Sequence, residues 1–71
     1  MVDDVLKVLS NPQESEELRT QVAEVLGWYV RCPKRDKIVR TCSLVLEDPS
    51  AGDELRAEVQ KTINRLENYM R

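Results

Sequence analysis

Apolar residues recur along the chain at intervals of three and four positions, which is the spacing of one face of an α-helix. The pattern occurs in four segments, at about residues 2–10, 13–31, 34–47 and 53–70. Prolines lie between the segments, and a residue that precedes proline is disfavoured in the helical conformation. No segment alternates apolar and polar residues as a half-buried strand would. The pattern therefore predicts an all-α fold of four antiparallel helices.

The apolar positions also predict which face of each helix lies in the core. In the second segment they fall at i, i+4, i+7, i+8 and i+11, and they comprise Leu18, Val22, Val25, Leu26 and Tyr29. We expect this face to pack on the first helix. The third helix is expected to bury Ile38, Val39, Cys42, Val45 and Leu46. The fourth is expected to bury Leu55, Val59, Thr62, Ile63, Leu66 and Met70.

The chain contains an internal repeat. Residues 9–22 match residues 46–59 at a constant offset of 37. The identical pairs are Leu9/Leu46, Pro12/Pro49, Glu17/Glu54, Leu18/Leu55, Arg19/Arg56 and Val22/Val59. A fixed period between about 20 and 50 residues is typical of arrays built from helix pairs. We therefore expect a single domain over residues 1–71, with one repeat at about 2–32 and a second at about 33–70.

These features resemble a known family. Two helices joined by an Asn-Pro or Asp-Pro step, with Glu-Leu-Arg before helically spaced apolar residues, are similar to HEAT repeats, most closely the short ones of bilin-lyase-like proteins. Residues 23–27, AEVLG, match the A-x-x-L-G pattern of that family, whereas residues 60–64, QKTIN, depart from it. The resemblance implies a right-handed α-α superhelix, with armadillo-like helices or a generic four-helix array as alternatives. A role as accessory to a pigment or cofactor lyase rests on fold analogy alone.

Small residues on the second helix predict where the two repeats join. Ala23 and Gly27 lie on a different side from the apolar stripe. A glycine inside a helix costs roughly 1 kcal/mol relative to alanine, so close approach of the fourth helix is a physical reason for Gly27. The equivalent residues of the second repeat, Gln60 and Asn64, are polar, as the outer surface of a terminal repeat should be.

Trp28 is the only tryptophan, and helical projection places it on a further flank of the second helix, beside Gln21 and Glu24. Two arrangements fit this position. The indole packs over the first helix and is buried, or it faces outward at the open N-terminal end of the array. In the second arrangement Trp28 and Gln21 are candidate contacts for a protein partner or a second copy, since tryptophan is enriched among interface anchors.

The overall composition excludes some classes of function. A net charge of −2 gives no general reason to expect binding to nucleic acid or to an anionic membrane. The apolar stretches are too short for a transmembrane helix. Asp3 and Asp4 stand where a signal peptide has basic residues, so we expect a cytoplasmic protein.

The charges are nevertheless segregated along the chain. The segment 31–40 is basic and contains Arg31, Lys34, Arg35, Lys37 and Arg40. The two turns within the repeats are acidic, and in an up-down array they lie at the end opposite to this segment. The dipole of a helix disfavours cations at its start, so basic residues there call for a functional reason. Binding of an anionic partner at the basic edge is such a reason. A solvated edge is the simpler interpretation.

The residues offer little for catalysis. The chain has no histidine, which removes the commonest general base and the commonest zinc ligand. Cys42 falls in an apolar stripe, where a thiol is inert, and Cys32 has no acid–base partner. A disulfide between them would span about 10 Å or more, too far for a bridge. We expect no enzyme activity, no metal and no cofactor.

The sequence therefore favours a non-enzymatic protein-protein interaction or scaffold module built from two HEAT-like repeats. Solenoids usually need about three repeats, so we expect a protein partner, a homodimer, or a chain that is a piece of a longer array. The alternative is an accessory or regulatory subunit that binds an anionic ligand or nucleic acid through the basic edge. Nucleic acid is disfavoured because the edge has no interleaved aromatic residues.

Overall fold

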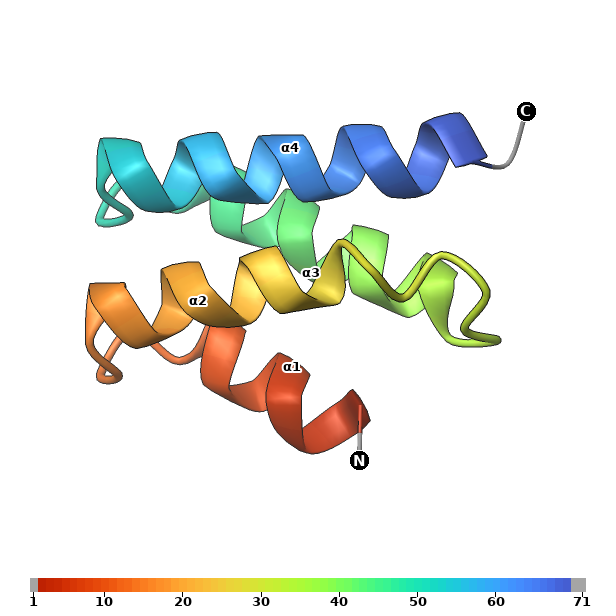
Figure 1. The fold of residues 1–71 in the computed structure, drawn as a ribbon. Helices are drawn as coiled ribbons and strands as arrows, with labels where there is room; N and C mark the ends of the chain where they lie inside the picture. The colour runs from red at the N-terminus through yellow and green to blue at the C-terminus, as the bar shows by residue number, and fades with distance from the viewer. Residues whose placement is uncertain (1, 70–71) are drawn as a thin grey trace.

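The computed structural model describes residues 2–69 and contains four helices (Figure 1). They are α1 (Val2–Ser10), α2 (Glu16–Leu26), α3 (Arg35–Glu47) and α4 (Asp53–Tyr69). No strand occurs among the described residues, so the predicted all-α class is confirmed. The expected inward position of Met70 falls outside the described residues.

The helices form two antiparallel pairs that lie side by side. α1 packs on α2 and α3 packs on α4 within the pairs, while α1 packs on α3 and α2 packs on α4 between them. Figure 1 shows the turns within the two pairs at one end of the molecule and the α2–α3 connection at the other. The acidic turns and the basic segment therefore lie at opposite ends, as the sequence predicts.

The two turns within the pairs have the same hydrogen bonds at an offset of 37 residues. The Asn11 carboxamide oxygen accepts from the Gln13 amide at 2.9 Å, and the Asp48 carboxylate accepts from the Ser50 amide at 2.9 Å. A short polar side chain that binds the backbone two residues on stabilises a turn at a helix end. Together with the prolines that follow them, Asn11 and Asp48 end α1 and α3.

The repeated arginine has a structural role in both pairs. Arg19 is buried, and its Nε donates to the Leu9 carbonyl at 2.8 Å. Arg56 Nη2 donates to the Asp48 carbonyl at 2.7 Å. The last carbonyls of a helix have no partner within that helix. Each arginine therefore satisfies a carbonyl at the end of the preceding helix and ties the two helices of its pair together.

The core lies between all four helices. Its apolar members are Leu6, Leu9, Ala23, Leu26, Ile38, Cys42, Val45, Ala51, Leu55, Val59, Ile63 and Leu66. In α4 the expected face is confirmed, with Thr62 also buried. In α3 the stripe is confirmed in part, because Val39 and Leu46 are only half-buried. The structure thus builds most of its core from the second repeat.

The second helix is shorter than the expected 13–31. It begins at Glu16 because Ser15 is the N-cap, whose hydroxyl accepts from the Leu18 amide at 3.1 Å. It ends at Leu26, after which the backbone hydrogen bonds from Gly27 and Trp28 run to carbonyls three residues back. Glycine favours such an ending, since it weakens the helix at that point.

The expected core face of α2 is also wrong in part. Arg19, Ala23 and Leu26 are its buried residues, whereas Leu18, Val25 and Tyr29 are exposed. The cause is the position of α4, which packs on the side of Ala23. The core-facing sector of α2 is the one between α1 and α4, and most of the apolar stripe lies outside that sector.

Candidate functional site

An exposed apolar stripe runs along α2. Leu18 is 40% exposed, Val25 52% and Tyr29 37%, and Val22 between them is half-buried. Leu18, Val22 and Val25 follow one another at i, i+4 and i+7, which is one line along the helix. Tyr29 lies beyond the end of α2, where its amide donates to the Leu26 carbonyl three residues back. We call these four residues the α2 stripe.

The same positions in the second repeat are completely covered. Adding 37 to each residue of the α2 stripe gives Leu55, Val59, Thr62 and Leu66 on α4, which we call the α4 stripe. All four are buried. Two stripes of matching register thus have opposite environments in one molecule.

The contact that covers the α4 stripe is formed by the small residues of α2. The Thr62 hydroxyl donates to the Ala23 carbonyl at 2.5 Å. A methyl group placed on Gly27 would lie 3.5 Å from the same hydroxyl and 3.7 Å from Arg65 Cδ. The two helix backbones therefore approach closely at Ala23 and Gly27, which confirms the expectation from the sequence.

The α2 stripe is open because of its place in the stack. α4 packs against its pair partner α3 on one side and against α2 on another. α2 likewise packs against its pair partner α1. Within residues 2–69, however, no further helix covers α2 in the way that α2 covers α4. The sequence identified the stripe as a core face. Its exposure follows from the packing within residues 2–69, where the α1–α2 pair has a neighbouring pair on one side only.

The opposite side of the stack is polar. Gln60 and Asn64 are exposed on α4, and the Gln60 amide donates to the Asn64 side-chain oxygen at 3.0 Å. They occupy the positions that Ala23 and Gly27 have on α2. The outer surface of the second repeat is therefore suited to water, whereas the outer surface of the first is apolar.

Trp28 has neither of the positions expected for it. Its side chain is 70% exposed, and the Arg65 guanidinium lies 4.3 Å from the centre of the ring. Both residues line a shallow groove of about 160 Å³ between α2 and α4, together with Glu24, Gly27, Glu58, Lys61 and Thr62. The expectation that Trp28 faces the N-terminal end is wrong, because the flank that it shares with Glu24 borders α4.

Gln21, the other candidate protein contact, is exposed on α2. It lies three residues after Leu18 and four before Val25, so it is a helical neighbour of both. Gln21 therefore borders the α2 stripe. The structure thus separates the two candidates, with Gln21 beside the stripe and Trp28 beside α4.

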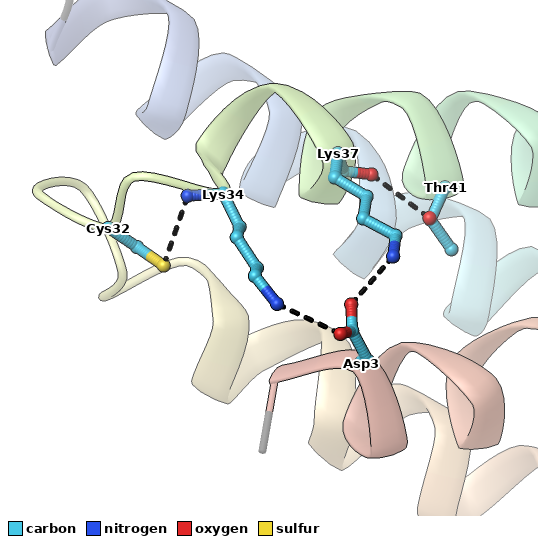
Figure 2. A network of polar contacts seen from close by, with 5 residues as sticks. All are labelled: Asp3, Cys32, Lys34, Lys37 and Thr41. Carbon is cyan, nitrogen blue, oxygen red and sulfur yellow. Dashed lines mark hydrogen bonds and ion pairs between the residues drawn. The ribbon is translucent and has the colours of Figure 1, made fainter.

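The basic edge is partly engaged within the chain. Figure 2 shows Lys34 and Lys37 converging on Asp3 of α1, with Nζ–carboxylate distances of 2.8 and 2.6 Å. Hydrogen bonds from Lys34 and then Lys37 hold the pKa of Asp3 well below its usual range, and the bond to Asp3 raises the pKa of Lys34. All three side chains stay partly exposed, so water screens these charges.

The three arginines of the edge do not share a common site. Arg31 Nε donates to the Tyr69 hydroxyl at 2.9 Å, and an Arg35 guanidinium nitrogen donates to the Val30 carbonyl. Arg40 is exposed, and no side-chain hydrogen bond or ion pair joins it to another described residue. Four of the five candidate cations therefore have side-chain contacts within the chain.

The acidic end contains a link between the repeats. Glu16 at the start of α2 accepts from the Gly52 amide at 2.7 Å, just before α4 begins. A side chain on Gly52 would overlap the Glu16 carboxylate. Gly52 is therefore needed for the close approach of this carboxylate, and the contact joins the two N-terminal helix ends.

The cysteines have the environments that the sequence predicts. Both thiols are free. Cys42 is buried in α3, and burial raises the pKa of its thiol to about 12, which keeps it protonated and unreactive at neutral pH. Cys32 lies in the α2–α3 connection, where its sulfur accepts from the Lys34 amide at 3.4 Å.

Residues 2–69 contain no group of three or more histidine, cysteine or acidic side chains placed to hold a metal ion. None of the four helices, over that same range, is long and apolar enough to cross a membrane.

Searches against protein families, curated proteins and solved structures each found no match for this chain.

Proposed function

We propose that the chain is a non-enzymatic protein-protein interaction module of two HEAT-like repeats, and that the α2 stripe is its contact surface. The observation that carries the proposal is the difference between the two stripes. The positions that are buried between helices in the second repeat are exposed in the first. Contiguous exposed apolar residues bordered by polar ones are typical of protein-contact sites.

The internal repeat also indicates what kind of surface fits the stripe. On α4, Thr62 meets the α2 backbone at Ala23, and the other residues of the stripe belong to the apolar core. A partner that offers an apolar helix face of matching spacing would cover the α2 stripe. Gln21 would lie at the edge of such a contact, where polar residues are usual.

An anionic ligand at the basic edge has less support. Lys34 and Lys37 share the Asp3 carboxylate, and Arg31 and Arg35 have partners within the chain. An anion would have to compete with these contacts or bind at the remaining exposed charge. The apolar surface is therefore the stronger candidate.

The proposal is tested with two matched variants of the immobilised protein. Val25→Glu places a charge in the α2 stripe, and Leu44→Glu places one at a similarly exposed apolar residue of α3 outside it, where the exposure is 60%. We expect a protein partner to be retained by the wild type and by Leu44→Glu and to be lost from Val25→Glu. Far-ultraviolet circular dichroism checks that both variants keep their helices.

Salt separates this function from its alternative. Contacts made by an apolar face persist when salt is raised, whereas binding led by cations to phosphates falls steeply. A contact at the stripe would be contradicted if Val25→Glu retained the same partner. It would also be contradicted if the wild type lost the partner between low and moderate salt.

A further inference from the structure

We propose that a second copy of this chain covers the α2 stripe, with the two α2 helices packed antiparallel about a two-fold axis. This inference rests on the function proposed above and names its partner. The axis passes between Val22 and Val25. Val22 of one copy then faces Val25 of the other, and Leu18 of one copy faces Tyr29 of the other.

The stripe is complementary to itself in this arrangement. Its residues are Leu18, Val22, Val25 and Tyr29, and none is charged. A two-fold contact brings one patch against the same patch, so the patch must tolerate its own chemistry. The stripe pairs valine with valine at its centre and leucine with the tyrosine ring at each end. The phenol oxygen at the rim can remain in water.

The charges at the two ends of α2 favour the antiparallel direction. Glu17 lies in the first turn of α2, and Glu14 just precedes that helix. The cluster of Asp3, Lys34 and Lys37 carries one net positive charge and belongs to the start of α1 and the start of α3. Figure 1 shows the turn before α2 at one end of the molecule and the α2–α3 connection at the other, so antiparallel packing places the acidic end of one copy along the basic end of the other. Parallel packing would place like charges together at both ends.

The other way to cover the stripe with a second copy is head-to-tail stacking, and the structure disfavours it. The surface that would meet the α2 stripe is then the outer side of α4, which presents Gln60 and Asn64. These amides would be buried against valine and leucine without replacement partners, and burying an unpaired amide is costly. Face-to-face pairing of two α2 stripes buries no such group.

The first experiment measures molar mass by light scattering from micromolar to millimolar concentrations. We expect the mass to rise from 8.2 kDa toward twice that value, because an interface built on one helix is small and its dimer weak. Val25→Glu should stay at the monomer mass at every concentration, while Leu44→Glu should follow the wild type. A monomeric wild type, or a Val25→Glu variant that dimerises equally well, would overturn the proposal.

The second experiment tests the direction of packing by cross-linking. Leu18→Cys and Tyr29→Cys are each made in a Cys32→Ser background, where the remaining Cys42 is buried and unreactive. A short bismaleimide should cross-link the mixture of the two variants into a dimer and leave each variant alone uncross-linked. Efficient cross-linking of Leu18→Cys by itself would overturn the antiparallel register.

The outcomes distinguish this inference from the function on which it rests. Suppose that the wild type is monomeric and that Val25→Glu still loses a captured partner. The α2 stripe is then a contact surface, but a second copy is not its occupant. If Val25→Glu changes neither the mass nor the capture, both proposals fail.

Discussion

The second helix of each pair carries a stripe in the same register, yet only the stripe of α4 is covered. On α4 the stripe lies against α2 and α3, and on α2 it faces solvent beside α1. Polarity cannot account for the difference, because the buried stripe contains Thr62 where the exposed one has Val25. The environment of each stripe is decided by the number of neighbours that its helix has in the stack.

The comparison also shows where the stability of the molecule resides. Residues of the α4 stripe contribute buried apolar area, while those of the α2 stripe contribute little until something covers them.

The largest effect is expected at the equivalent leucines. Leu55→Ala should lower the free energy of unfolding by about 2–5 kcal/mol, because it leaves a cavity in the core. Leu18→Ala should lower it by about 1 kcal/mol or less, since Leu18 is already partly in water. The free energy of unfolding of a chain of this size is roughly 4–10 kcal/mol, so Leu55→Ala should lose a large share of its stability. Urea unfolding of both variants at low protein concentration measures the difference, and equal losses would refute it.

The next effect concerns the repeated arginines. Arg19→Met keeps most of the apolar stem but removes the donor to the Leu9 carbonyl, and it should cost about 1.5–3 kcal/mol. Arg56→Met should cost less, because Arg56 is only half-buried and its Nε already lacks a partner among the described residues. The same unfolding measurement compares them. A larger loss at Arg56 would mean that the second repeat depends more on this link than the first.

Trp28 should behave as a surface residue. Its contact with Arg65 is exposed, so Trp28→Ala should cost only about 0.5–1 kcal/mol. A tryptophan buried over α1 would cost about 3–5 kcal/mol. In the wild type, iodide or acrylamide should quench its fluorescence readily. Strong protection from both quenchers would show that the indole is covered in solution.

The smallest effect is expected from the contact of Asp3 with Lys34 and Lys37. The pKa of Asp3 is lowered by these lysines, so its contribution to stability is present above the ordinary pKa of about 4 and is lost as the pH falls through the lowered value. The pKa of Lys34 is raised, so its contribution is present below about 10 and is lost as the pH rises through the raised value.

Thermal unfolding of Asp3→Asn across this range tests that window. The variant should unfold at a slightly lower temperature than the wild type near neutral pH, and the difference should vanish in strong acid. Asp4→Asn is the matched control at the neighbouring exposed carboxylate. A difference that persists at the lowest pH would assign the effect to packing instead of charge.

Much of the fold follows from local sequence. The apolar spacing and the Asn-Pro and Asp-Pro steps predict four helices, and the ends of α1, α3 and α4 agree with them to within one residue over the described range. The end of α2 is harder to predict, because residues 27–31 continue a helical pattern. There the backbone after Gly27 changes to hydrogen bonds between residues three apart.

The candidate site was less predictable, for reasons of distance along the chain. Nothing near Lys34 and Lys37 indicates that Asp3, more than thirty residues earlier, lies between them. The position of Trp28 was missed because helical projection requires α2 to continue to residue 31, whereas the helix ends at Leu26. Periodicity identified the α2 stripe as apolar. Its exposure required knowing which side of α2 has a neighbour.

The connection between α2 and α3 has a consequence for how the molecule can be divided. It is held by backbone hydrogen bonds between residues three apart and by side-chain contacts of Arg31, Lys34 and Arg35. Arg31 and Lys34 are exposed, and a trypsin-like protease cuts after such residues. The repeats are joined elsewhere, through α1–α3 and α2–α4 packing and the Glu16–Gly52 contact. A single cut in this connection should therefore leave a nicked but assembled protein, whose two halves can be produced separately and tested for reassociation.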